Sequence, residues 1–118
     1  MKFLPNILTV GTWNIEGIYE RVNGINVCKL EDETFEKTLK KFDILCLQET
    51  HLAKNESLSI PDNYVAIPHC RNISKNNRYF GGMLLLIKKL FRKGIKIKQD
   101  FDADALVITL DENFFGLE

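Results

Sequence analysis

Short apolar runs separated by polar segments set the pattern of this chain, and the clearest run lies in FDILCLQETHL, residues 42–52. Four apolar residues from Ile44 to Leu47 are followed directly by Gln48 and Glu49. A short apolar run with polar borders is typical of a strand that is buried on both faces. Apolar residues also predict strands over residues 6–15, 43–49, 64–69, 83–89 and 105–110, and the alternation in residues 95–98 predicts a half-exposed strand.

One segment has helical spacing, residues 31–41. Leu30 precedes it, Phe35, Leu39 and Phe42 fall three or four positions apart on one face, acidic residues lead the segment, and lysines close it, which suits the helix dipole. Residues 16–30, 53–63 and 71–79 are expected to be loops, and residues 111–113 a turn. A strand, a helix and a strand in succession predict a right-handed crossover that joins two parallel strands, 6–15 and 43–49, both central in an α/β sheet.

Polar side chains end both of these strands. Asn14 and Glu49 would lie on the same edge of the sheet, because the carboxyl ends of parallel neighbours coincide, and ligands of open α/β sheets collect there. An amide oxygen and a carboxylate suit Mg²⁺. Each residue also has a plainer interpretation, since Asn14 can cap a turn and Glu49 can be a solvated strand end. Gly81-Gly82, before the strand at 83–89, fits a tight turn or a close approach of a phosphate to the backbone.

Charge matters through its distribution, because 16 basic and 16 acidic residues balance over the 118 residues of the chain. From His69 to Lys98 there is no Asp or Glu, and the nine basic residues are Arg71, Lys75, Arg78, Lys88, Lys89, Arg92, Lys93, Lys96 and Lys98. A block of one sign attracts phosphates, although lysines at strand edges also discourage edge pairing. Both interpretations stay open.

The remaining composition bears on cellular location. Three cysteines in no framework spacing indicate a reduced, intracellular protein, and Cys46 is expected in the core. The N-terminal segment is too short and too interrupted for a membrane span and lacks a small-residue cleavage site, so we expect neither a membrane protein nor a secreted one. A nuclear location is expected if the protein acts on chromosomal DNA.

The motifs TWNIEG at 12–17, FDILCLQETHL at 42–52 and YFGGMLLLIKK at 79–89, in this order and spacing, resemble the endonuclease/exonuclease/phosphatase superfamily. The motifs QETHL and GGMLLLIKK are most similar to those of the apurinic-type endonuclease domain of non-LTR retrotransposons and of proteins derived from such elements. In such elements a reverse transcriptase follows the endonuclease domain. The resemblance implies the first half of a four-layer α/β sandwich, a mixed β-sheet with an outer helix. It also implies cleavage of nucleic acid phosphodiesters, DNA above all, that depends on Mg²⁺ or Mn²⁺.

The resemblance assigns roles to individual residues. Glu49 matches the metal-binding glutamate, and Asn14 matches the asparagine that arranges the metal and the scissile phosphate. Tyr79 matches, more weakly, a tyrosine that contacts nucleic acid, and Arg71, Lys75 and Arg78 in the same loop are candidate substrate contacts. His51 is not the catalytic histidine, which the family places near the end of the domain.

The chain departs from the family in its second half. A catalytic tyrosine, an Asp-x-Asn pair and a terminal Asp-His pair are missing from the 118 residues, and Asp102 and Asp104 do not supply the Asp-x-Asn pair. We therefore expect residues 1–118 to be the N-terminal portion of one domain, inactive alone, with one sheet face left bare for a second sheet from outside the chain. A phosphatase of the same fold and a non-catalytic nucleic-acid-binding module remain alternatives.

Overall fold

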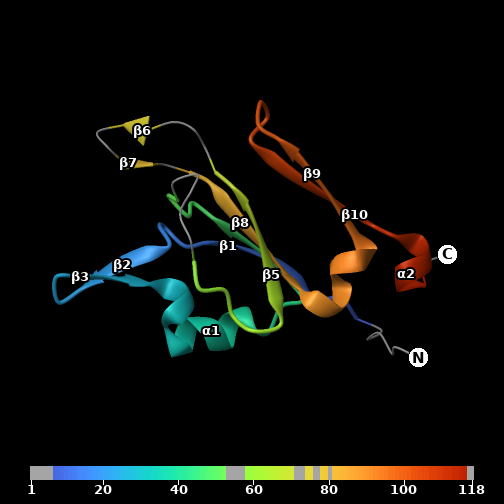
Figure 1. Cartoon of the computed structure of the whole chain (residues 1–118), viewed down its shortest axis with the longest axis horizontal. Helices are drawn as coiled ribbons and strands as arrows, with labels where there is room; N and C mark the ends of the chain where they lie inside the picture. The colour runs from blue at the N-terminus through green and yellow to red at the C-terminus, as the bar shows by residue number, and fades with distance from the viewer. Residues whose placement is uncertain (1–6, 53–57, 71–73, 76–77, 80, 117–118) are drawn as a thin grey trace.

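The computed structural model describes residues 7–52, 58–70, 74–75, 78–79 and 81–116 (Figure 1). Its main sheet contains β1 (Val10–Asn14), β4 (Ile44–Gln48), β8 (Met83–Lys88) and β5 (Tyr64–His69), in the order β1-β4-β8-β5. β1 runs parallel to β4, while β8 is antiparallel to both β4 and β5. The predicted mixed α/β sheet and its parallel crossover are therefore confirmed.

The position of β1 in the sheet corrects one expectation. We expected both β1 and β4 to be central, but within the described residues β1 lies at the edge of the sheet, and of these two strands β4 alone has a neighbour on both sides. The side chain of Val10 is 54% exposed, whereas Ile44, Leu45 and Leu47 of β4 are at most 1% exposed. The apolar residues of β1 misled the prediction because the partly buried Trp13 stacks on Phe35 of the helix and not against a second neighbouring strand.

One face of the sheet is covered by α1 (Glu33–Leu39), which follows the short 3-10 helix η1 (Lys29–Glu31). Asp32 caps α1 by accepting a hydrogen bond from the backbone N–H of Thr34, and Phe35 and Leu39 point into the core. They pack there with Leu45, Leu47, Leu84 and Leu86 of the sheet. The helix predicted over residues 31–41 is confirmed, shorter at both ends.

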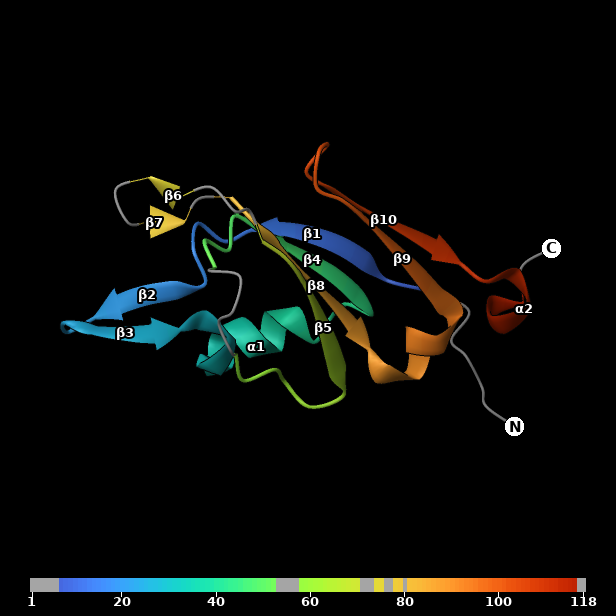
Figure 2. The same ribbon diagram turned by 45° about the horizontal axis from the view of Figure 1, so that its top comes forward.

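The opposite face is covered by a hairpin of the same chain, which we did not expect (Figure 2). Strands β9 (Ile95–Asp100) and β10 (Ala105–Leu110) follow the 3-10 helix η2 (Lys89–Gly94) and precede α2 (Glu112–Phe115). A second apolar cluster joins Ile44, Leu85 and Ile87 of the sheet to Ile97 and Ile108 of the hairpin. The expectation of a bare face was wrong, because the two short strands at 95–98 and 105–110 pair and fold back over it.

Segments expected to be irregular also contain strands. Residues 16–30 form a hairpin of β2 (Tyr19–Val22) and β3 (Ile25–Cys28) around the turn Asn23-Gly24, followed by η1. In the segment 71–79, β6 (Ser74–Lys75) pairs with β7 (Arg78–Tyr79). α2 replaces the turn expected at 111–113. Among the described residues, no helix combines the length and apolar character of a membrane span.

The three cysteines are free thiols, and Cys28 and Cys70 are buried. Cys46 is partly buried on β4, where it packs against the cluster beneath the hairpin, as expected for a core residue. Burial raises the pKa of the Cys46 thiol above its usual range. The thiol therefore stays protonated and serves as a packing group.

A polar cluster at the end of the sheet opposite to Asn14 and Glu49 is structural. The Asp43 carboxylate accepts a hydrogen bond from the backbone N–H of Thr9 at 2.8 Å and pairs with the Lys88 ammonium at 3.0 Å. The Tyr64 hydroxyl donates to the backbone carbonyl of Phe42 at 2.5 Å. Each buried group of this cluster has a partner, so the cluster fixes the start of β4.

Tyr64 gives the fold a predictable response to alkali. Burial, and secondly the charge of Asp43, raise the pKa of its hydroxyl in the folded protein. An unfolded tyrosine ionises near pH ~10, so ionisation above that pH stabilises the unfolded state. We expect the free energy of unfolding to fall as the pH rises beyond ~10. In Tyr64→Phe this fall should be smaller, with a loss of about 1 kcal/mol at neutral pH from the missing hydrogen bond. Denaturant titrations at several pH values measure both, and equal alkaline slopes would contradict the assignment.

Candidate functional site

The carboxyl ends of β1 and β4 meet at one edge of the sheet, here called the rim. Asn14 pairs with Gln48 in the parallel register. The pairing continues past both strands, because the N–H groups of Ile15, Gly17 and Ile18 donate to the carbonyls of Gln48, Glu49 and Thr50 at 3.1, 2.6 and 2.9 Å. The predicted placement of Asn14 and Glu49 on the same edge is therefore what the structure has.

The start of β8 completes the rim from the other side of β4. The N–H of His51 donates to the carbonyl of Gly81 at 2.9 Å, and the N–H of Thr50 donates to that of Gly82 at 3.3 Å. Gly82 has a φ of 82°, and a Cβ there would lie 3.0 Å from the Thr50 hydroxyl oxygen. The glycine pair thus serves the close approach of β8 to the segment after β4.

Left-handed backbone gathers at this rim. Glu16, Glu49 and His51 have φ values of 51°, 54° and 56°, and Gly17, Gly81 and Gly82 are also positive. A non-glycine residue in this region carries a conformational cost. Such costs concentrate at ligand and catalytic sites, where the surrounding structure imposes a required geometry. The rim is therefore the place in the described chain where a site is expected on backbone grounds.

Asn14 is the last residue of β1. Its side-chain oxygen accepts a hydrogen bond from the backbone N–H of Glu16 at 3.1 Å, which is the turn-capping role left open by the sequence. It lines a hollow of about 230 Å³ together with Trp13, Ile15, Glu16, Glu20, Lys29, Asp32 and Phe35. Trp13 stacks on Phe35 at a centroid distance of 4.4 Å, and the Lys29 ammonium donates to the Ile15 carbonyl.

Glu49 lines a different hollow, on the hairpin side of the rim. This hollow of about 240 Å³, here called the Glu49 pocket, is bounded by Gln48, Glu49, Gly81, Gly82, Met83 and Asp104. Asn14 and Glu49 thus share the rim, and each lines one of the two hollows described here. The carboxylate of Glu49 is exposed and has no hydrogen-bond or ion-pair partner among the described residues, whereas that of Asp43 is fully engaged.

The donor set of the Glu49 pocket suits a hard cation. Mg²⁺ is usually bound by one or two carboxylates, with waters and substrate phosphates filling its other positions. The pocket offers the carboxylates of Glu49 and Asp104. Across the described part of the chain, no three His, Cys, Asp or Glu side chains converge into a closed protein cage. An open site of the kind that Mg²⁺ shares with a phosphate therefore fits, and a fully enclosed structural site does not.

The candidate substrate-binding residues are only partly placed. Arg71 lies outside the described residues, while Lys75 on β6 and Arg78 on β7 are backbone register partners. Tyr79 ends β7, two residues before Gly81 of the rim. This ribbon therefore leads directly into the Glu49 pocket along the chain.

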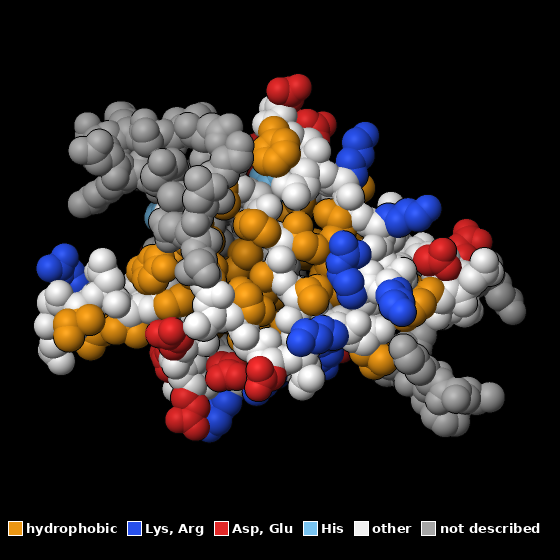
Figure 3. All heavy atoms as spheres, in the orientation of Figure 1, with side chains coloured by type: hydrophobic (Ala, Val, Ile, Leu, Met, Phe, Trp, Pro, Cys, Tyr) orange, Lys and Arg blue, Asp and Glu red, His pale blue; other side chains and the backbone are white. Residues whose placement is uncertain are grey.

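The later part of the basic block has two kinds of member. Lys88 pairs with Asp43, and the Arg92 guanidinium donates to the Ile95 carbonyl at 2.9 Å, so both have structural roles. Other lysines of η2 and β9 are exposed, namely Lys89, Lys93, Lys96 and Lys98. Figure 3 shows basic side chains gathered over the part of the molecule that η2 and β9 form. Because β8 is antiparallel to β4, η2 starts at the end of the sheet opposite to the rim. The block is therefore not one surface around Glu49.

Sequence reasoning missed three residues of the rim and its surroundings. Glu16 follows Asn14 by two positions and lines the same hollow, a spacing that could have marked it. Asp104 reaches the Glu49 pocket from the tip of the hairpin β9–β10, and His69 pairs with it. No local pattern connects residues 49, 69 and 104, so folding alone brings them together.

Comparison with known proteins gives one match. Residues 11–116 match the sequence model of the Endonuclease/Exonuclease/phosphatase family. The matched range contains both strand ends of the rim, the glycine pair and the hairpin. No curated protein and no solved structure matched the chain. The resemblance read from the motifs is thus confirmed at the level of the family, and its retrotransposon-specific part is not supported by any relative.

Proposed function

Because the chain belongs to the endonuclease/exonuclease/phosphatase family, whose chemistry is the hydrolysis of phosphodiesters and phosphate esters, we propose that it carries the first half of a site that cleaves nucleic acid phosphodiesters. The observation that carries this proposal is the parallel pairing of β1 with β4, which sets Asn14 and Glu49 on one rim. The exposed Glu49 carboxylate, without a partner in the described chain, supports a ligand role over a structural one.

Each rim residue has a proposed task. Glu49 binds Mg²⁺ or Mn²⁺, which when bound neutralises charge on the phosphoryl oxygens and polarises them. Asn14 keeps the turn after β1 in shape through its bond to Glu16 and presents its NH₂ group toward the substrate phosphate. Arg71, Lys75, Arg78 and Tyr79 contact the nucleic acid on its way to the Glu49 pocket.

DNA is the substrate that we favour, in the manner of a retrotransposon endonuclease. The motifs QETHL and GGMLLLIKK and the basic segment from Arg71 to Arg78 support this choice. The runner-up is a phosphatase of the same fold, which would use the same rim. A non-catalytic nucleic-acid-binding module would keep the basic segment and not require Glu49.

Cleavage assays separate the three proposals. The 118-residue chain should not nick supercoiled plasmid alone, because we propose that the Asp-x-Asn and Asp-His groups come from later sequence. When joined to the later motifs of a complete family member, it should nick plasmid with Mg²⁺ and stop with a chelator. Hydrolysis of a phosphomonoester without nicking would favour the phosphatase. DNA binding without either reaction would favour the binding module.

The basic segment gives a quantitative prediction for DNA binding. Replacing Arg71, Lys75 and Arg78 by alanine should make the negative slope of log K against log salt shallower by about 2–3, since each lost phosphate contact removes ~0.9 from its magnitude. The measurement is a fluorescence titration of duplex DNA at several salt concentrations. The control replaces Lys37, Lys40 and Lys41 around the end of α1, which changes the net charge equally and should leave the slope within about one. An equal fall in both variants would mean that only net charge matters.

A further inference from the structure

We propose that Asp104 is the second carboxylate of the metal site at Glu49, and that the buried imidazole of His69 is the positioning residue that holds it there. This inference rests on the proposed function of Glu49 and extends it to the hairpin β9–β10. With the cation bound, Glu49 would be the direct ligand, and Asp104 would accept hydrogen bonds from water molecules around the cation.

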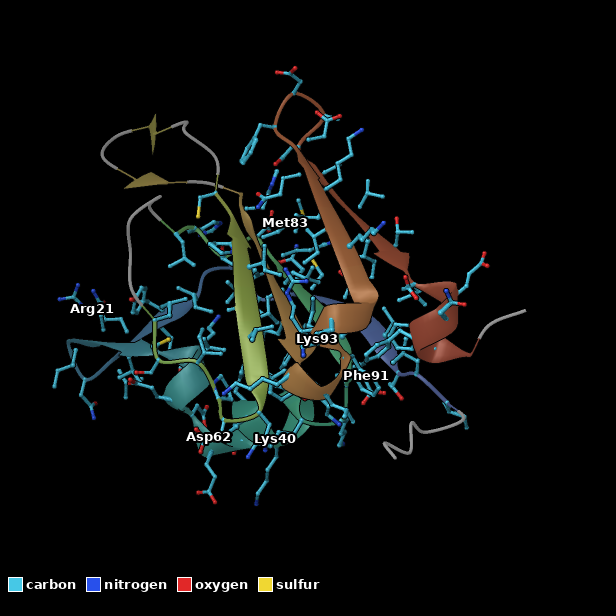
Figure 4. The ribbon with its side chains drawn as sticks, turned by 45° about the vertical axis from the view of Figure 1, so that its right-hand side comes forward. Arg21, Lys40, Asp62, Met83, Phe91 and Lys93 are labelled. Atoms are coloured by element: carbon cyan, nitrogen blue, oxygen red, sulfur yellow. The ribbon has the colours of Figure 1, made fainter. Side chains whose placement is uncertain are left out.

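The tip of the hairpin forms one wall of the Glu49 pocket. Asp104 lies in the turn between β9 and β10, and it lines the pocket together with Glu49, Gly81, Gly82 and Met83. Met83, labelled in Figure 4, begins β8 and is the register partner of His69 on β5. The two carboxylates therefore reach one small space from separate parts of the fold, one from the main sheet and one from its cover.

The buried imidazole of His69 contacts the carboxylate of Asp104 and holds it in place. The imidazole is 1% exposed, and its Nε2 lies 3.3 Å from the Asp104 Oδ1. Its Nδ1 lies 2.9 Å from the Gln99 side-chain oxygen, and the ring of Phe101 stacks on it at a centroid distance of 4.6 Å. Both ring nitrogens of His69 thus have polar partners, Gln99 at Nδ1 and Asp104 at Nε2. The imidazole is too deeply buried to reach a substrate, so it acts only through Asp104.

Attachment of the hairpin alone does not account for this arrangement. The apolar contacts of Ile97 and Ile108 already fix the hairpin to the sheet. Burying an imidazole beneath it adds a desolvation cost that only good hydrogen bonds offset. Asp104 itself has a φ of 53°, a conformation that glycine adopts without cost. A buried imidazole that is costly to desolvate and a left-handed backbone thus accompany the placement of the Asp104 carboxylate at the Glu49 pocket.

A second carboxylate has a defined task beside Mg²⁺. The ion gives up its waters reluctantly and keeps several of them when bound by few protein ligands. Acceptors around those waters orient them, and loss of such a partner typically weakens metal binding by about 10–100-fold. Asp104 is the one other carboxylate among the residues that bound the pocket.

The test measures binding of Mn²⁺ alone to the 118-residue chain, by water-proton relaxation. Asp104→Asn should raise the dissociation constant about tenfold. Asp102→Asn is the matched control in the same turn, because Asp102 is exposed and does not line the pocket, and it should bind as the wild type does. Equal binding by the two variants would overturn the role of Asp104. Binding unchanged in Glu49→Gln would instead overturn the proposed function, so the two failures are distinguishable.

His69 is tested by a double-mutant cycle with the same measurement. His69→Gln should weaken Mn²⁺ binding about as much as Asp104→Asn does, and the double variant should be no weaker than Asp104→Asn alone. A merely structural role would lower the melting temperature and leave the affinity of the folded fraction unchanged, and that result would overturn the positioning role. If His69→Gln does not fold, Gln99→Leu removes the hydrogen bond at Nδ1 and should weaken Mn²⁺ binding severalfold through loss of ring orientation. Unchanged binding there would also count against the proposal.

Discussion

Replacing Glu49 by alanine should abolish metal-dependent cleavage in a protein that joins this chain to the later motifs of the family. The expected loss is about 10²–10³-fold or more, the range for removal of one main source of charge stabilisation at a reacting centre. The fold should be unaffected, because the carboxylate is exposed and has no partner among the described residues. Plasmid nicking across a range of Mg²⁺ concentrations is the measurement.

The control for Glu49→Ala is Glu33→Ala, which removes an exposed carboxylate at the start of α1, away from the rim. It changes the net charge equally and should leave cleavage within about twofold, with a small loss of helix stability from the dipole effect. Partial rescue of Glu49→Ala by high Mn²⁺ would agree with a ligand role. Cleavage near the wild-type rate at low Mg²⁺ would remove Glu49 from the mechanism.

The pairing of β1 with β4 at the rim was predictable from the sequence, because it follows from patterns within short segments of the chain. The apolar run before Gln48, the helix before it and the polar ends of two strands together specify a parallel crossover, and the structure has that pairing from Val10 to Asn14. The environment of each side chain was less predictable. Asn14 and Glu49 each line a different one of the two described hollows, and the left-handed turns at Glu16 and Glu49 redirect the chain directly after each strand, which no local pattern announces.

The parts that sequence reasoning missed depend on contacts between distant segments. Nothing in residues 95–110 says that the hairpin folds back over β4 and β8, since alternation in Ile95–Lys98 shows only that one face is apolar. The edge position of β1 is hidden for a similar reason, because Trp13 stacks on Phe35 of the helix and gives β1 the apolar character of a central strand. His69 and Asp104 are 35 positions apart in the chain and come together only because the hairpin β9–β10 folds back over the sheet that contains β5.

Introducing a charge on the inner face of the hairpin should have the largest effect on stability. Ile108 pairs with Ile97 in the hairpin register, and both pack into the apolar cluster beneath it. Ile108→Asp removes apolar contacts and places a carboxylate in that cluster without a partner of opposite charge. We expect a loss of about 2–4 kcal/mol in the free energy of unfolding, from denaturant titration. The face formed by Ile44, Leu85 and Ile87 would become accessible, and increased binding of an apolar dye should report it.

Val107→Asp is the matched control, because the neighbouring side chain points outward and is 49% exposed. The same chemical change there should cost under about 1 kcal/mol and leave dye binding unchanged. Light scattering adds a second comparison, since an uncovered apolar face promotes association, so Ile108→Asp should form larger species at concentrations where Val107→Asp and the wild type do not. Equal stability and equal size for the two variants would mean that the hairpin does not cover the sheet in solution. In that case Asp104 would not be held over the Glu49 pocket either, and the effect of Asp104→Asn on Mn²⁺ binding should disappear with it.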